Sequence, residues 1–187
     1  MAQNTGTVTT ASITPDPAQT VVIFVAIATS NGSPSPIPKV AGGQAIWNRI
    51  VTAAPGPGSP RQISAFAATR VSPGPLRISY PPAMRMDVLW SIVQSPGAVA
   101  QFGTASSMVF TQTGTIALPA QPQGRVVAGF LIGTITSVEP VSPAVKLGQA
   151  NRPGLGASIS SHRSTAQQVR VNWSSNAHWV GIALELR

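Results

Sequence analysis

Clusters of proline and glycine divide this chain into short segments, and that division restricts the folds it can adopt. The 187 residues include 18 prolines and 17 glycines, concentrated in stretches such as Pro34–Pro38 and Pro55–Pro60. Proline lacks a backbone N–H and interrupts both helices and sheet ladders, so these stretches are expected to be loops. The segments between them are short and rich in Val, Ile and Thr, which favours strands over helices.

Apolar and alternating segments predict roughly ten strands. Val21–Ala28 is a continuous β-branched and aromatic run of strand length, which predicts a buried strand. Thr7–Ile13 and Leu76–Tyr80 alternate between polar and apolar residues, which predicts half-exposed strands, the first at a sheet edge. Gln44–Ala53 fits either a short helix or a strand, and its β-branched and aromatic residues favour a strand. The other expected strands are Gln62–Thr69, Met86–Gln94, Arg125–Ile135, Gln167–Trp173 and Trp179–Leu186.

Three further segments are expected to reverse the chain. Ser30–Ser33 contains Asn-Gly, a strong signal for a tight turn. Ser95–Thr104 is expected to be a loop or a short turn of helix. Ser107–Thr111 and Thr115–Leu118 are expected to form a hairpin around Thr113-Gly114.

Short strands at regular spacing, with turn signals between them, are typical of an antiparallel β-sandwich or barrel. No helical segment alternates with the strands, so a parallel α/β fold is not expected. The sequence therefore predicts an all-β, jelly-roll-like antiparallel β-sandwich over residues 21–187. The polar, Thr-rich residues 1–20 are expected to form an extended N-terminal arm.

Residues that usually build catalytic and metal sites are scarce. The chain has no cysteine, and its carboxylates and imidazoles stand singly at Asp16, Asp87, Glu139, Glu185, His162 and His178. On paper, Ser160 or Ser161 with His162 and Asp87 could form a Ser-His-Asp triad, but geometry alone decides such an arrangement. No catalytic, cofactor-binding or metal-binding residue is therefore assigned, and the chain is expected not to be an enzyme.

The chain carries a net charge of +8, but its basic residues are dispersed. None precedes Lys39, and no two are adjacent, whereas binding to phosphates needs several converging cations. We therefore expect contact with an acidic protein partner and not with nucleic acid. No apolar run approaches the ~18–20 residues of a membrane span, so no membrane contact is expected.

The four tryptophans could belong either to the core or to a sugar-binding platform. Trp47, Trp90, Trp173 and Trp179 each lie in an apolar or alternating segment, where burial is the usual outcome. We therefore expect core positions, with Trp173 nearest to the surface.

The order of these features resembles the β-sandwich structural proteins of tailed bacteriophages. The resemblance rests on packing motifs that span most of the chain: Val21–Ser33, Ile46–Val51, Ile63–Val71, Val126–Gly133 and the ending Val171–Arg187. It implies a virion protein, assembled in the host cytoplasm, that decorates or reinforces a phage head, or else a tail-associated domain. The implied partners are the major capsid protein or other virion subunits, together with further copies of the chain.

Docking of this kind would use apolar contacts and isolated arginines. The candidate partner-contacting residues are Val8, Ile13, Arg61, Arg77, Arg152 and Arg170. The first two lie on the arm, which could add a strand to a neighbour's sheet, and the arginines could meet carboxylates of a shell. Two alternatives stay open, a self-assembling jelly-roll coat protein of a small icosahedral virus and a carbohydrate-binding or tail-associated module.

Overall fold

A computed structural model describes residues 6–29, 32–81, 86–153 and 156–187. Within these ranges the chain forms thirteen strands. They are β1 (Thr7–Ile13), β2 (Thr20–Thr29), β3 (Lys39–Gly42), β4 (Asn48–Ala53), β5 (Arg61–Ala68), β6 (Gly74–Ser79), β7 (Met86–Ser95), β8 (Val99–Ala117), β9 (Arg125–Ile132), β10 (Val138–Pro140), β11 (Val145–Arg152), β12 (Ala157–Ser164) and β13 (Gln168–Leu186).

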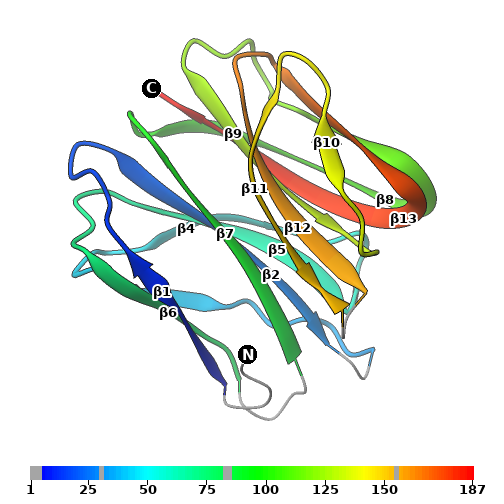
Figure 1. Ribbon diagram of the computed structural model, residues 1–187, viewed down its shortest axis with the longest axis horizontal. Helices are drawn as coiled ribbons and strands as arrows, with labels where there is room; N and C mark the ends of the chain where they lie inside the picture. Colours follow the sequence, from blue (N-terminus) through cyan, green and yellow to red (C-terminus); the bar gives the residue numbers. More distant parts are fainter. Residues whose placement is uncertain (1–5, 30–31, 82–85, 154–155) are drawn as a thin grey trace.

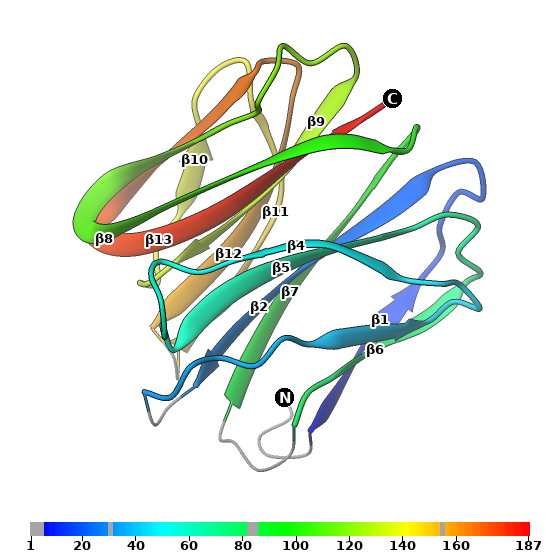
Figure 2. The same ribbon diagram turned by 180° about the vertical axis from the view of Figure 1, so that it is seen from behind.

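The strands form three antiparallel sheets that stack in layers (Figures 1 and 2). The outer sheet has the order β1-β6-β3, and the central sheet has the order β4-β5-β2-β7. The large sheet runs β10-β13-β9-β12-β11, with β8 paired along the remaining edge of β13. The expected all-β antiparallel sandwich is thereby confirmed, with a third layer added.

The central sheet is covered on both faces, which explains the continuous apolar run of β2. Phe24 and its alternate neighbours pack against the large sheet, whereas Ile23 and its alternate neighbours pack against the outer sheet. All ten residues of β2 are buried. A strand with two buried faces has no solvent side on which polar residues could alternate.

The central and large sheets approach closely at Gly129 of β9. A Cβ at this position would lie only 2.5 Å from the ring of Phe24. The glycine therefore leaves the space that the aromatic ring occupies between the two layers.

The large sheet curls and encloses a core of its own. Its two 19-residue strands, β8 and β13, pair as a long ribbon whose register shifts between Asn172 and Trp179. At the opposite edge, the side chain of Gln149 on β11 bonds the backbone N–H of Val138 (3.0 Å) and the carbonyl of Thr136 (2.6 Å) beside β10. Phe130, Trp173 and Trp179 lie in the enclosed space.

The expected edge strand at Thr7–Ile13 is confirmed as β1, which lies at the edge of the outer sheet. Thr7 pairs with Ser79, and Val8 is buried against the core of that sheet. The second half of Gln44–Ala53 forms strand β4, as its β-branched residues favoured. The loops at Pro34–Pro38 and Pro55–Pro60 are also confirmed. Residues 1–5 of the expected arm and residues 30–31 of the expected Asn-Gly turn lie outside the described residues.

Two expectations about residues 95–118 are wrong. The segment Ser95–Thr104 is not a loop or helical turn, because β7 extends to Ser95 and β8 begins at Val99. The hairpin around Thr113-Gly114 does not exist, since β8 runs unbroken through both residues. Gly114 serves close packing instead, because a Cβ there would lie 3.1 Å from the ring of Trp179.

Candidate functional site

The structure separates the residues from which a catalytic triad could be drawn. Asp87 at the start of β7 pairs with Arg152 of β11, whose Nε and Nη2 atoms lie 2.8 and 2.5 Å from one carboxylate oxygen. His162 of β12 lies with its Nε2 atom 3.0 Å from the Ser160 hydroxyl. The Ser161 hydroxyl accepts instead from the Ser91 hydroxyl of β7, at 2.7 Å.

The environment of His162 favours the neutral imidazole. Its side chain is fully buried, and burial lowers the pKa to about 4, with a further lowering by the charge of Lys146 and a smaller opposing effect of Glu139. The Nδ1 atom has no hydrogen-bond partner among the described residues. His162 therefore packs as a neutral ring, at an edge-on angle to Phe130 with 5.7 Å between ring centroids.

Glu185 is a buried carboxylate with a structural role. Its oxygens accept hydrogen bonds from the backbone N–H groups of Gln123 (2.6 Å) and Gly124 (2.8 Å) and from the Gln101 amide (2.7 Å). Arg187 adds an ion pair at 3.3 Å. Burial acts to raise the pKa of Glu185, but these bonds outweigh it and hold the pKa below its ordinary value.

Among the described residues, no three His, Asp or Glu side chains gather closely enough to hold a metal ion. The same part of the chain contains no helix that is long and apolar enough to cross a membrane.

The most unusual surface feature is the free edge of β8. Over the described part of the chain, β8 pairs with β13 and with no other strand, so its second edge is free of ladder hydrogen bonds. Its nineteen residues include no charged residue and no proline. Natural edge strands are usually protected from other chains by charges, proline or bulges. The part of β8 from Gln101 to Ser107 pairs with β13 in a regular register, so no bulge interrupts that part of the strand.

The middle of β8 carries an exposed apolar tip, defined as Met108, Val109 and Phe110. These side chains are 62%, 71% and 61% exposed. Phe110 contacts the ring of His178 at a centroid distance of 4.0 Å, and Met108 lies over the loop at Gly56. Three consecutive large apolar residues exposed beside a free strand edge are characteristic of a contact surface for another protein.

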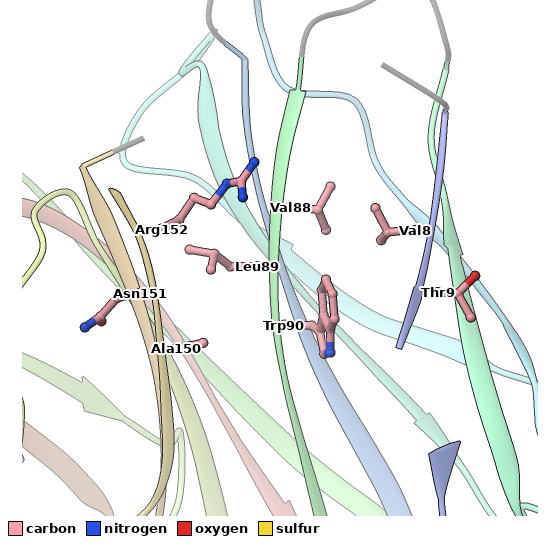
Figure 3. Close-up of a pocket in the computed structure, with 8 residues that line it drawn as sticks. All are labelled: Val8, Thr9, Val88, Leu89, Trp90, Ala150, Asn151 and Arg152. Carbon is pink, nitrogen blue, oxygen red and sulfur yellow. The ribbon is translucent and has the colours of Figure 1, made fainter. Parts of the chain in front are cut away.

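The opposite side of the molecule holds a groove between three other sheet edges (Figure 3). Strands β1, β7 and β11 each lie at the edge of their sheet, and together they line a cavity of about 410 Å³. In Figure 3, Val88 and Trp90 project from β7 toward β1, whereas Leu89 projects toward β11. The Asp87–Arg152 ion pair ties the central sheet to the large sheet here.

The six candidate partner-contacting residues are dispersed over the molecule. Val8 and Arg152 both line the groove, although Val8 is itself buried and Arg152 is held by Asp87. Ile13 packs partly buried against the core under the outer sheet. The remaining three are Arg61, whose guanidinium lies against Gly133, Arg77 on the exposed face of β6, and Arg170, which donates to Thr113 of β8.

The tryptophans are placed largely as their segments indicated, with one exception. Trp173 is buried in the large sheet, where its Nε1 donates to the carbonyl of Thr111 at 2.8 Å. The expectation that it would lie nearest to the surface is therefore wrong. Trp179 is buried as well, whereas Trp47 and Trp90 are half-buried against the other core.

Sequence reasoning did not single out the apolar tip, because Met108–Phe110 was assigned to one arm of a hairpin. The signal was three consecutive large apolar residues within an otherwise small and polar segment, Gly103–Gly114. A strand that is buried on one face would alternate, so this break in alternation could have identified the tip.

No protein-family model, curated protein or solved structure matches this chain.

Proposed function

We propose that this protein is a non-enzymatic virion structural protein that docks on other protein subunits, as a capsid decoration or minor capsid protein of a phage head. In this role it would act as a rigid clamp that bridges shell subunits and works in several copies. The sequence resemblance to phage β-sandwich structural proteins supplies the class of partner. The free edge and apolar tip of β8 supply the observation that supports docking.

The tip would provide affinity because its side chains lose their contact with water on binding. Full burial of a Val, Met or Phe side chain contributes about 1.5–3 kcal/mol each relative to exposure. The neighbouring edge of β8 would add backbone hydrogen bonds if a partner strand extended the large sheet.

Charge favours an acidic partner. Three of the four carboxylates are already paired inside the chain, as Asp87–Arg152, Glu139–Lys146 and Glu185–Arg187. Seven basic residues make no ion pair within the described part of the chain, namely Lys39, Arg49, Arg70, Arg77, Arg125, Arg163 and Arg170. Carboxylates on a partner would complement this surplus and would accelerate association.

The test is to express the chain together with the particle genes of its own genome and to measure its copy number on purified particles. The intact protein is expected at a fixed number of copies per particle. Val109→Asp, which places a charge in the tip, should reduce that number about tenfold. Thr9→Asp introduces the same charge on the opposite side of the molecule and should leave the number unchanged.

The result would contradict the proposal if the protein were absent from particles, or if both variants bound as the intact protein does. Expression of the chain without any other phage protein distinguishes the coat-protein alternative from the docking role. Closed shells assembled from this chain only would replace a docking role by a coat role.

A second candidate function is glycan binding in the groove along β7. The half-buried indole of Trp90 lines this cavity together with Arg152, whose side chain points toward β7, whereas the side chains of Thr9 and Asn151 point away from it (Figure 3). An aromatic face with nearby hydrogen-bonding groups is suited to a sugar ring. Screening on a glycan array should show binding that Trp90→Ala abolishes and Trp47→Ala preserves. Absence of binding by the intact protein would remove this candidate.

A further inference from the structure

We propose that the pocket at the ends of β9, β11 and β12 binds a tetrahedral oxyanion, a phosphate or sulfate group. The pocket has a volume of about 390 Å³. Its lining residues are Arg125, Pro143, Val145, Arg163, Ser164 and Thr165. This site lies apart from the β8 edge and does not depend on the proposed docking role.

The two arginines are brought together by the register of the large sheet. Arg163 of β12 pairs with Val127 of β9, and Arg125 lies two residues before Val127. Side chains two residues apart on a strand share a face, so Arg125 lies on the same face as Val127 and Arg163. The two arginines are therefore diagonal cross-strand neighbours, and the Cα atoms of such a pair are roughly 7–8 Å apart. Val145 of β11 lies directly opposite Arg163 on the same face and, with Pro143, forms an apolar wall.

Nearby carboxylates cannot neutralise this pair, because they lie on the other face of the sheet. Glu139 forms an ion pair with Lys146, and Lys146 lies opposite His162 on the neighbouring strand. Because His162 and Arg163 are consecutive, their side chains point to opposite faces, so Glu139 lies on the face away from Arg163. Glu185 is opposite Val126, so it also lies on the face away from Arg125. Both arginines are exposed, and neither makes an ion pair within the described residues. Two cations placed this close repel each other, and an anion bound between them in the pocket would remove that repulsion.

A divalent tetrahedral group matches this arrangement better than a carboxylate does. Two guanidinium groups can each donate paired hydrogen bonds to separate oxygens, and the two charges of sulfate or phosphate balance both cations. The hydroxyl groups of Ser164 and Thr165 are further hydrogen-bonding groups in the pocket wall. A single carboxylate would leave one positive charge uncompensated.

The experiment is calorimetric titration of the intact protein with inorganic sulfate, inorganic phosphate and acetate at constant ionic strength. Sulfate and phosphate should bind at least about tenfold more tightly than acetate. Arg125→Gln and Arg163→Gln should each weaken sulfate binding by about tenfold, the loss of a charged hydrogen-bonding group.

Arg77→Gln is the matched control. Arg77 is also a diagonal neighbour of a cation, Lys39, but this pair lies on the outer sheet. Its loss removes the same charge and should change sulfate binding less than twofold. All three arginines are exposed, so the variants should fold, which circular dichroism can verify.

Three results would overturn the proposal. They are acetate binding as tight as sulfate binding, unchanged affinity in both pocket variants, and an equal loss of affinity in Arg77→Gln. If sulfate and phosphate both bind, titration with a phosphate ester and a sulfate ester of the same monosaccharide identifies the natural source of the oxyanion. The phosphate ester, which carries up to two negative charges, is expected to bind more tightly than the singly charged sulfate ester. A preference for the sulfate ester would contradict the charge argument.

Discussion

Individual side chains show that buried polar groups of this protein are hydrogen-bonded to different degrees. Glu185 is surrounded by N–H donors, so its charge is stable in the interior. His162 has one hydrogen-bonding neighbour and remains neutral. The two groups therefore respond in related ways to acid, because in both cases the folded state holds a proton less readily than the unfolded chain does.

The first prediction concerns His162 and pH. Its pKa in the folded state, about 4, lies below the ordinary 6.5, so between these values the unfolded chain binds a proton that the folded chain does not. Stability should therefore fall as the pH decreases from 6.5 to 4, by up to about 3 kcal/mol. Urea unfolding at a series of pH values measures this, and His162→Gln should show a shallower decline. An identical pH dependence in the variant would exclude His162 as the cause.

A second prediction concerns Gly129, on which the ring of Phe24 rests. Gly129→Ala should destabilise the protein by about 1–3 kcal/mol, because the added methyl group overpacks the contact between the two sheets. Gly148→Ala is the control, since a Cβ there would meet only side-chain oxygens at ordinary distances, 3.6 and 3.8 Å. Thermal unfolding of both variants compares them, and equal stabilities would show that the sheets can separate slightly at no cost.

Among the elements, β2 and β8 mark the two extremes of burial. β2 is enclosed by neighbouring strands at both edges and by sheets on both faces. β8 has one free edge and a largely exposed outer surface. The sequence of β2 made it easy to identify as a strand, because the continuous apolar run Val21–Ala28 has few other interpretations. The small polar residues of β8 resemble a loop, and only its pairing with β13 makes it a strand.

The third prediction follows from the two buried faces of β2. Phe24→Ala should cost about 3–5 kcal/mol and Ile23→Ala about 2–5 kcal/mol, although these neighbours point into different cores. In β6, which has one buried face, Ile78→Ala should be similarly costly, whereas Arg77→Ala should change stability by less than about 0.5 kcal/mol. Chemical unfolding of the four variants tests this contrast. A mild effect of Ile23→Ala would mean that the outer sheet contributes little to stability.

At the scale of the whole molecule, the three sheets stack so that edge strands lie on two sides of the molecule. One side presents β1, β7 and β11 around the groove, and β8 lies on the other side next to β4. Both sides lie on a surface whose cations outnumber its anions. The fold therefore presents two different lateral surfaces, one with the groove and one with the unpaired edge of β8.

The fourth prediction concerns this charge surplus. At a net charge of +8, the unpaired cations repel one another, and salt screens that repulsion over a Debye length of about 8–10 Å. The melting temperature should therefore rise when sodium chloride is increased from about 10 mM to about 300 mM. Differential scanning calorimetry measures the change. A falling melting temperature would mean that the three internal ion pairs outweigh the repulsion.

Sequence alone determined the strands that are defined by their own residues. The apolar run at Val21–Ala28, the alternation at Thr7–Ile13 and the proline-rich loops each follow from local physical chemistry, and so does the all-β class. The charge surplus and the scarcity of acid–base groups are also properties of the sequence.

Only the tertiary structure decided which faces and edges are covered. Nothing local reveals which two sheets cover β2, that Gly114 lies beneath Trp179, or that Arg125 and Arg163 are neighbours. These relations join residues that are distant along the chain, and strand register fixes them. The exposed tip of β8 and the arginine pocket arise in the same way, because exposure depends on where the other strands end.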